Sequence, residues 1–229
     1  MQRELNAAPD SVTAMKQIWG YTKTEDGTLR ITNYKGRQTE VTVPERIGKN
    51  RVSAIGKGAF SGDRFDAPRA DPSQVEFRRG ITKIILPEGI TAIGENAFSH
   101  IEKLRYAELP SSVSSIGDFA FSCCERLEKI VFTGENIVLG DYALCDCDRL
   151  KEVVFSEGVK SIKIGWYVFE HCDRLQKLVL PSTLNAFTVD EKDSFLEYCS
   201  DACAIVRKNS FAEKYCVKYD IKYKYPEEK

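Results

Sequence analysis

Residues 81–104 read ITKIILPEGITAIGENAFSHIEKL, and three similar copies follow in the same frame. Residues 104–127 read LRYAELPSSVSSIGDFAFSCCERL, and residues 127–150 read LEKIVFTGENIVLGDYALCDCDRL. Residues 150–175 read LKEVVFSEGVKSIKIGWYVFEHCDRL, so the period is 23 residues three times and then 25. A fixed period of this length is typical of repeat architectures, and it decides the fold of this chain.

Matching positions of the copies carry residues of the same kind. A partial copy precedes them at 41–60, and a degenerate copy begins at Leu175. The apolar columns are Ile81, Leu104, Leu127, Leu150 and Leu175; then Ile84, Ala107, Ile130, Val153 and Leu178; then Leu86, Leu109, Phe132, Phe155 and Leu180. One copy is too short to bury its own apolar face, so neighbouring copies stack and share one core.

The local pattern predicts the structure of each copy. The L-x-x-I-x-L stretch indicates a short strand that pairs in parallel with the same stretch of the next copy. Proline follows it at Pro87, Pro110 and Pro181, and ends the ladder because it has no N–H to donate. A second extended piece such as 90–93 follows, and an Ala-Phe pair on a helical turn completes the copy. The predicted fold is an α/β solenoid with parallel strands and short helical turns.

The composition limits the classes of function. Lys and Arg total 33 and Asp and Glu total 34 in 229 residues, which gives a net charge of −1 and argues against nucleic-acid binding. Apolar residues make up 42%, enough for a core, and no window approaches the roughly 18 apolar residues of a membrane helix. The first residues show no signal peptide, so we expect either a cytoplasmic chain or an export signal outside this sequence.

The regions outside the regular copies have their own signals. Asp26-Gly27 lies between two strand-like stretches and predicts a hairpin that caps the first copy. Ser210 predicts the start of a helix that carries Phe211, Tyr215 and Val217, with a strand over 221–225. The expected organisation is a flexible lead-in at 1–17 and one domain at 18–225, made of an N-terminal cap at 18–40, about six repeats at 41–203 and a C-terminal cap at 204–225.

Two departures interrupt the pattern. Residues 61–80, SGDRFDAPRADPSQVEFRRG, are an insertion of about 15 residues with two Pro and eight charges. It is interpreted as a surface loop, either a tolerated insertion or a partner-binding loop. The two extra residues of the fourth copy are expected to form a bulge near 163–165.

The segments LPEGITAIGENAF (86–98) and LPSSVSSIGDFAFSCCERL (109–127) closely resemble the BspA-type leucine-rich repeat family. The stretches 26–60 and 204–225 are similar to that family's N-terminal and C-terminal units. The resemblance implies a right-handed horseshoe solenoid over about residues 18–225. It also implies a surface or secreted bacterial protein that binds other proteins, although a shared fold does not establish a shared function.

The cysteine positions are explained by the repeat. Ile101, Cys124, Cys147 and Cys172 form one column, so this position is a core position and buried thiols are expected there. Cys199, Cys203 and Cys216 are also expected to be free thiols, since nothing completes a zinc set. His100 and His171 share a variable column and are expected at the surface. No catalytic or cofactor-binding motif is present, so we predict no enzyme, no metal and no cofactor.

A candidate binding surface lies between the core columns, because strand side chains alternate between two faces. We call it the strand-face strip and expect it on the outer, concave face. Its residues are Lys83, Ile85, Tyr106, Glu108, Lys129, Val131, Glu152, Val154, Lys177 and Val179. The pattern fits plain β-propensity with mixed charges, and it also fits a shallow protein-binding surface with Tyr106 as anchor.

Two functions remain open from the sequence. One is a non-enzymatic interaction module of the bacterial surface or adhesion type, which binds a protein ligand on the concave sheet. The alternative is an intracellular scaffold, or a recognition domain of a larger protein. We expect a monomer that binds a protein and neither nucleic acid nor the membrane interior.

Overall fold

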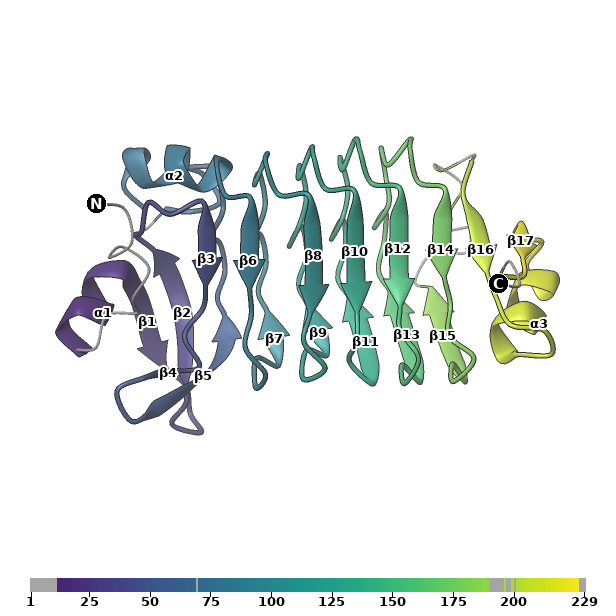
Figure 1. The fold of residues 1–229 in the computed structure, drawn as a ribbon, viewed down its shortest axis with the longest axis horizontal. Coiled ribbons are helices and arrows are strands. Elements are labelled where there is room, and N and C mark those ends of the chain that lie inside the picture. The colour runs from purple at the N-terminus through teal and green to yellow at the C-terminus, as the bar shows by residue number, and fades with distance from the viewer. Residues whose placement is uncertain (1–11, 69, 190–195, 197–198, 200, 227–229) are drawn as a thin grey trace, which may run out of the picture.

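The computed structural model describes residues 12–68, 70–189, 196, 199 and 201–226. Its strands stack side by side along one long axis, with the N-terminal hairpin at one end and a helix at the other (Figure 1). The chain is a parallel-strand β-solenoid, as the repeat predicts. Each repeat contributes two short strands, which belong to two different sheets.

One sheet contains the second extended piece of each copy together with the N-terminal strands. Its strands are β1 (Trp19–Lys23), β2 (Leu29–Tyr34), β4 (Arg46–Ile47), β5 (Asn50–Ile55), β7 (Ala92–Ile93), β9 (Ser115–Ile116), β11 (Asn136–Leu139), β13 (Ser161–Ile164) and β15 (Ala186–Val189). The order is β1-β2-β5-β7-β9-β11-β13-β15, with β4 beside β5. All pairs from β2 onward along this order are parallel, so each copy places its strand next to the equivalent strand of the following copy.

The L-x-x-I-x-L stretches and the C-terminal strands form the other strands. They are β3 (Glu40–Thr42), β6 (Lys83–Ile85), β8 (Tyr106–Leu109), β10 (Lys129–Phe132), β12 (Glu152–Phe155), β14 (Lys177–Val179), β16 (Cys203–Ile205) and β17 (Tyr223–Lys224). They fall into a two-stranded sheet, β3-β6, and a six-stranded sheet, β17-β16-β14-β12-β10-β8. Within the described residues no ladder joins β6 to β8, which the uniform repeat pattern did not predict.

The Ala-Phe pair lies on hydrogen-bonded turns and not on an α-helix. Two positions of each turn have a left-handed backbone, with φ between 53° and 56°. They are the columns Asn96, Phe119, Tyr142 and Tyr167, and His100, Cys123, Asp146 and His171. This alternating backbone lets each turn bond to the next, as in Phe98 N–H to the Ala120 carbonyl at 2.8 Å and Phe121 N–H to Ala143 at 2.8 Å. The turns therefore form a hydrogen-bonded stack of their own.

The predicted apolar columns form the core. Phe98 stacks on Phe121 with ring centroids 5.1 Å apart, and Phe132 stacks on Phe155 at 4.9 Å. All four rings are buried. The two extra residues of the fourth copy do not form a bulge near 163–165. They lie in the turn between β12 and β13 instead, because β10 pairs with β12 at an offset of 23 residues and β11 pairs with β13 at an offset of 25. β13 itself pairs in unbroken register with β11 and β15.

Both ends of the solenoid are covered by terminal elements. The helix α1 (Val12–Ile18) includes part of the predicted flexible lead-in, and Met15 and Ile18 pack against the core. β1 and β2 form the antiparallel hairpin that Asp26-Gly27 predicts. At the other end, the Ser210 hydroxyl accepts a bond from Glu213 N–H at the start of α3 (Phe211–Lys218). The exact domain boundaries stay a prediction.

The insertion at 61–80 is more ordered than the predicted surface loop. It contains α2 (Pro72–Arg79), whose N-cap Asp71 forms a capping box with Gln74. Arg78 on this helix is fully buried. Its guanidinium donates to the Tyr34 carbonyl from Nε at 3.0 Å, to the Ser61 carbonyl at 3.3 Å and to the Asn33 side chain. The insertion is thus anchored to the N-terminal hairpin and the first turn.

Candidate protein-binding surface

The strand-face strip is built by the parallel register of the six-stranded sheet. Tyr106 lies beside Lys129, and Lys129 beside Glu152, which in turn lies beside Lys177. A second row places Glu108, Val131, Val154 and Val179 next to one another. The structure therefore brings eight of the ten predicted residues together on one sheet. Lys83 and Ile85 lie on β6, across the break from β8.

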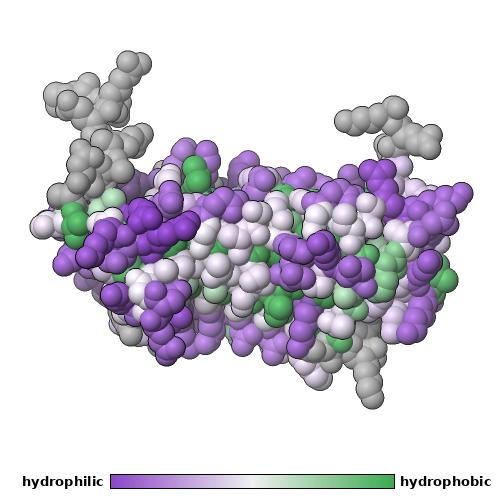
Figure 2. Space-filling model, turned by 90° about the horizontal axis from the view of Figure 1, so that it is seen from below, coloured by the Kyte–Doolittle hydropathy of each residue, from purple (hydrophilic) through white to green (hydrophobic). Residues whose placement is uncertain are grey.

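Exposure divides the strip into two parts. Ile85 and Tyr106 are 44% and 46% exposed, whereas Val131 is 8% exposed. Val154 and Val179 are half-buried. The apolar contact area is consequently concentrated at the end of the strip near β6 and β8. The strands of this face lie side by side in Figure 1, and the molecule seen from below in Figure 2 shows hydrophobic residues scattered among hydrophilic and neutral ones.

The charges on the strip are partly paired. Lys129 Nζ lies 3.3 Å from the Glu152 carboxylate, an exposed cross-strand pair that contributes little to stability. The Tyr106 hydroxyl donates to the Glu108 carboxylate at 2.7 Å. This hydrogen bond raises the pKa of Tyr106 to about 12, because it stabilises the protonated phenol. Tyr106 is therefore held as a neutral, partly oriented aromatic side chain on the surface.

Two grooves lie on this face. One has a volume of about 360 Å³ and is bounded by β6 and β8; its walls include Lys83, Ile85, Tyr106 and Glu108. The other, of about 260 Å³, lies at the C-terminal end between Glu152, Lys177, Val179 and the strand β17. Both grooves contain residues of the predicted strip. The sequence predicted that these residues share one face, and the structure adds the two grooves.

A second exposed feature was missed by the sequence analysis. Phe119, Tyr142 and Tyr167 stack along the turns, with centroids 4.9 Å and 5.3 Å apart, and Trp166 packs beside Tyr167. The signal was present, since these rings recur at the repeat interval one column before the Ala-Phe pair. Aromatic stacking between copies stabilises the left-handed turns, so this ladder has a structural role.

The thiol column is a core feature, as predicted. Cys124, Cys147 and Cys172 are fully buried, and their Sγ atoms donate to carbonyls of the preceding copies at 3.1 to 3.3 Å. All eight cysteines are free. Burial raises the pKa of Cys124 to about 12, since a thiolate would be desolvated there.

His100 lies near the insertion, with Nε2 4.0 Å from the Asp66 carboxylate.

These thiols should be unreactive in the native protein. We expect iodoacetamide at pH 8 to modify at most Cys123, the one cysteine that is not buried. Even this thiol should react slowly, because burial and the nearby Asp146 raise its pKa to about 11 and leave little thiolate. Mass spectrometry of the intact chain measures the added mass, and labelling in guanidinium chloride, where all eight should react, is the control. Rapid native labelling of Cys124 or Cys147 would contradict the buried column.

The fold, with a parallel ladder and a repeating apolar column, defines a leucine-rich repeat solenoid. The sequence matches the family described as BspA type leucine rich repeat region, in six copies over residues 76–202. The chain belongs to the BspA-type leucine-rich repeat family. Proteins of this family and fold are generally non-enzymatic. Among the described residues, no helix is both long and apolar enough to cross a membrane.

Solved bacterial structures share the fold. A leucine-rich repeat protein of Treponema pallidum is 22% identical with a TM-score of 0.58, over 90% of this chain and 95% of that one. A leucine-rich cell surface protein of Faecalibacterium prausnitzii is 18% identical with a TM-score of 0.52, and 82% of this chain matches 53% of it. A leucine-rich repeat protein of Eubacterium ventriosum is 19% identical with a TM-score of 0.52, over 83% of this chain and 52% of that one. No curated protein matches the sequence.

Proposed function

We propose that the chain is a non-enzymatic interaction module of the bacterial surface type, which binds a protein partner on the strand-face strip. The observation that carries the proposal is the set of outward-facing apolar side chains on neighbouring strands, with Ile85 exposed on β6 and Val154 and Val179 half-buried on β12 and β14. A face of this kind, next to an exposed Tyr106, suits a protein surface better than a small substrate. Family membership supports the same class of function.

The location of the protein is part of this proposal. A structural relative of this chain is described as a cell surface protein. We therefore expect protease treatment of intact source cells to release peptides of this chain, which mass spectrometry would detect. Retention of all its peptides until lysis would instead favour the alternative, an intracellular scaffold or recognition domain.

The strip itself is tested by a pair of matched variants. Wild-type chain and the double variant Tyr106→Ala/Val154→Lys are immobilised and used to capture proteins. We expect the double variant to lose a partner that the wild type retains, with at least a tenfold fall in affinity, because an apolar contact is removed and a charge introduced. The control is Val138→Lys, since Val138 is 43% exposed on β11 of the other sheet. Equal loss with the control, or no loss with the double variant, would contradict the proposal.

A further inference from the structure

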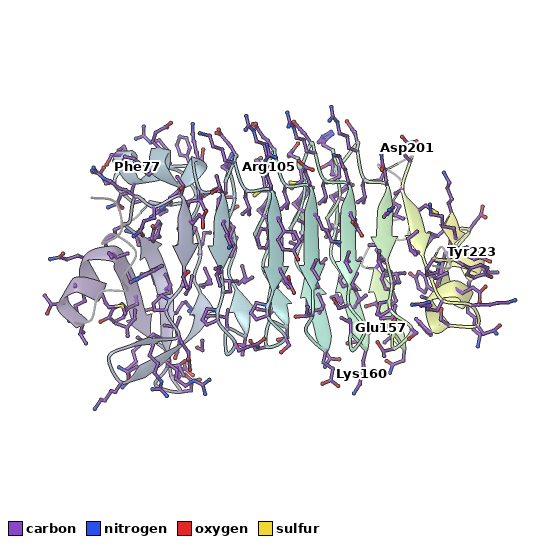
Figure 3. All side chains as sticks on the ribbon, in the orientation of Figure 1. Phe77, Arg105, Glu157, Lys160, Asp201 and Tyr223 are labelled. Carbon is purple, nitrogen blue, oxygen red and sulfur yellow. The ribbon has the colours of Figure 1, made fainter. Side chains whose placement is uncertain are left out.

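A pocket of about 330 Å³ lies where the N-terminal hairpin, the first turn and the insertion meet. Its walls include Arg30 of the hairpin, residues 56–58 of the turn, and Ala67 and Pro68 of the insertion. The volume is at the lower end of the roughly 300–1,000 Å³ that is typical of small-ligand sites. Figure 1 shows α2 of the insertion at the same end of the solenoid as β1 and β2, and Phe77, labelled in Figure 3, marks this helix. Because β1 and β2 belong to the nine-stranded sheet, the pocket is separate from the strand-face strip.

The pocket exists because the hairpin is shorter than a repeat at this point. Ile31 is the partner of Ile55 in the parallel ladder, and the Tyr34 ring stacks on Phe60 with centroids 5.3 Å apart. Two residues separate Ile31 from Tyr34, whereas four separate Ile55 from Phe60. Residues 57–58 of the first turn therefore have no counterpart in the hairpin, and the space next to them stays open.

The backbone of Lys57 lacks the partners that its equivalents have in later copies. There the carbonyl of this column accepts a bond from the preceding copy, as the Glu95 carbonyl does from Gly58 N–H at 3.0 Å. The N–H of the column can bind a carboxylate of the preceding copy, as Trp166 N–H donates to Asp141 Oδ1 at 2.8 Å. Within the described residues, neither the carbonyl nor the N–H of Lys57 has such a partner. Both groups therefore point toward the open space beside the hairpin.

The unpaired cation of the pocket is Arg30. A Cβ at Gly56 would lie 3.2 Å from Cγ and Cδ of Arg30, so the stem of this side chain crosses the glycine. In the part of the chain that the structure describes, its guanidinium makes no ion pair and no hydrogen bond. The other cation, Lys57, already pairs with Glu95 at 2.6 Å, and no described acidic residue lines the pocket. The pocket therefore attracts an anion.

The insertion supplies an apolar wall next to these polar groups. Ala67 is buried, and Pro68 lies beside it on the pocket side. The wall lies directly on the turn, because Gly58 has a φ of +60° and a Cβ there would overlap the Asp66 carbonyl oxygen. Since Arg78 anchors the insertion to the hairpin, this wall is in place before a ligand binds.

We propose that this pocket binds a small apolar residue with a free carboxylate, either an amino acid or the last residue of a peptide. The carboxylate pairs with the guanidinium of Arg30 and accepts from Lys57 N–H, as a carboxylate of the chain does at the equivalent N–H of Trp166. The nitrogen on the α-carbon of the ligand donates to the Lys57 carbonyl, and its side chain lies against Ala67 and Pro68. A sulfate ion fits less well, because it has no donor for this carbonyl and no apolar part.

Isothermal titration calorimetry of the full chain tests the proposal. The probes are alanine, valine and leucine, each as the free amino acid, as the N-acetyl derivative, and as the same two compounds with a C-terminal amide. We expect a free or N-acetylated carboxylate to bind, and its amide to bind at least tenfold more weakly, because the amide loses the charge-assisted bonds to Arg30. Arg30→Gln should weaken the same ligand at least tenfold. The matched control is Arg126→Gln, at an exposed arginine before β10, which should leave binding unchanged.

The form that binds identifies the source of the carboxylate. Binding of the free amino acids assigns the site to them, whereas binding of the N-acetylated forms alone assigns it to the C-terminus of a peptide. The proposal is overturned if none of these carboxylates binds, if the amides or Arg30→Gln bind equally well, or if sulfate binds as tightly. The strip variant Tyr106→Ala/Val154→Lys should bind the ligand as the wild type does, so failure at this pocket and failure of the strand-face strip are distinguishable.

Discussion

Replacement of Arg78 by alanine should lower the free energy of unfolding by about 3 to 5 kcal/mol, as expected when one partner of a buried charged hydrogen-bond network is removed. The guanidinium is fully buried and donates to the Tyr34 and Ser61 carbonyls and to the Asn33 side chain. Alanine leaves these buried acceptors without their donors and also leaves a cavity. Urea unfolding followed by circular dichroism measures the change.

The control for this prediction is Arg64→Ala. Arg64 lies in the same insertion but is exposed, and its guanidinium lies over the Phe65 ring at 6.0 Å. Its removal should change the unfolding free energy by less than about 0.5 kcal/mol. A loss of less than about 1 kcal/mol for Arg78→Ala would show that the insertion is not anchored through this side chain.

Replacement of Phe155 by alanine should cost about 3 to 5 kcal/mol, which is typical for deletion of a buried aromatic ring. Phe155 is 1% exposed and stacks on Phe132 at 4.9 Å. The neighbouring copies cannot collapse onto the cavity, because their strands are held in register on both sides. The same urea titration reports the effect.

Val154→Lys on the same strand is the control, because it changes the outward face of β12 and leaves the core face unchanged. Val154 points outward and is half-buried, so lysine can extend its ammonium into water while its stem lies on the sheet. We expect a cost below about 1 kcal/mol. Equal destabilisation by the two substitutions would contradict the assignment of Phe155 to the core and Val154 to the strip.

The repeat columns were predictable because burial in a solenoid recurs with the period of the sequence. Leu127, Ile130 and Phe132 are all buried, as their columns predict. The outward row was predictable from the alternation of strand side chains. The register of the strands then follows, since each strand pairs with the equivalent positions of the next copy.

The irregular features were not predictable from the columns. The helix α2 had a local signal in Asp71-Pro72-Ser73-Gln74, but the eight charges of the insertion favoured a loop. The buried position of Arg78 depends on Asn33 and Tyr34, which lie more than forty residues earlier. Within the described residues no ladder joins β6 to β8, and the uniform columns gave no sign of this.

Lysine footprinting of the complex tests the central claim most directly. The partner captured by the wild type is bound, and the free and bound chains are acetylated and compared by mass spectrometry. The account predicts that Lys83, Lys129 and Lys177 on the strand-face strip lose reactivity, while Lys163, exposed on the other sheet, keeps it. Protection of Lys163 with unchanged reactivity of the three strip lysines would place the partner on the opposite face and contradict the account.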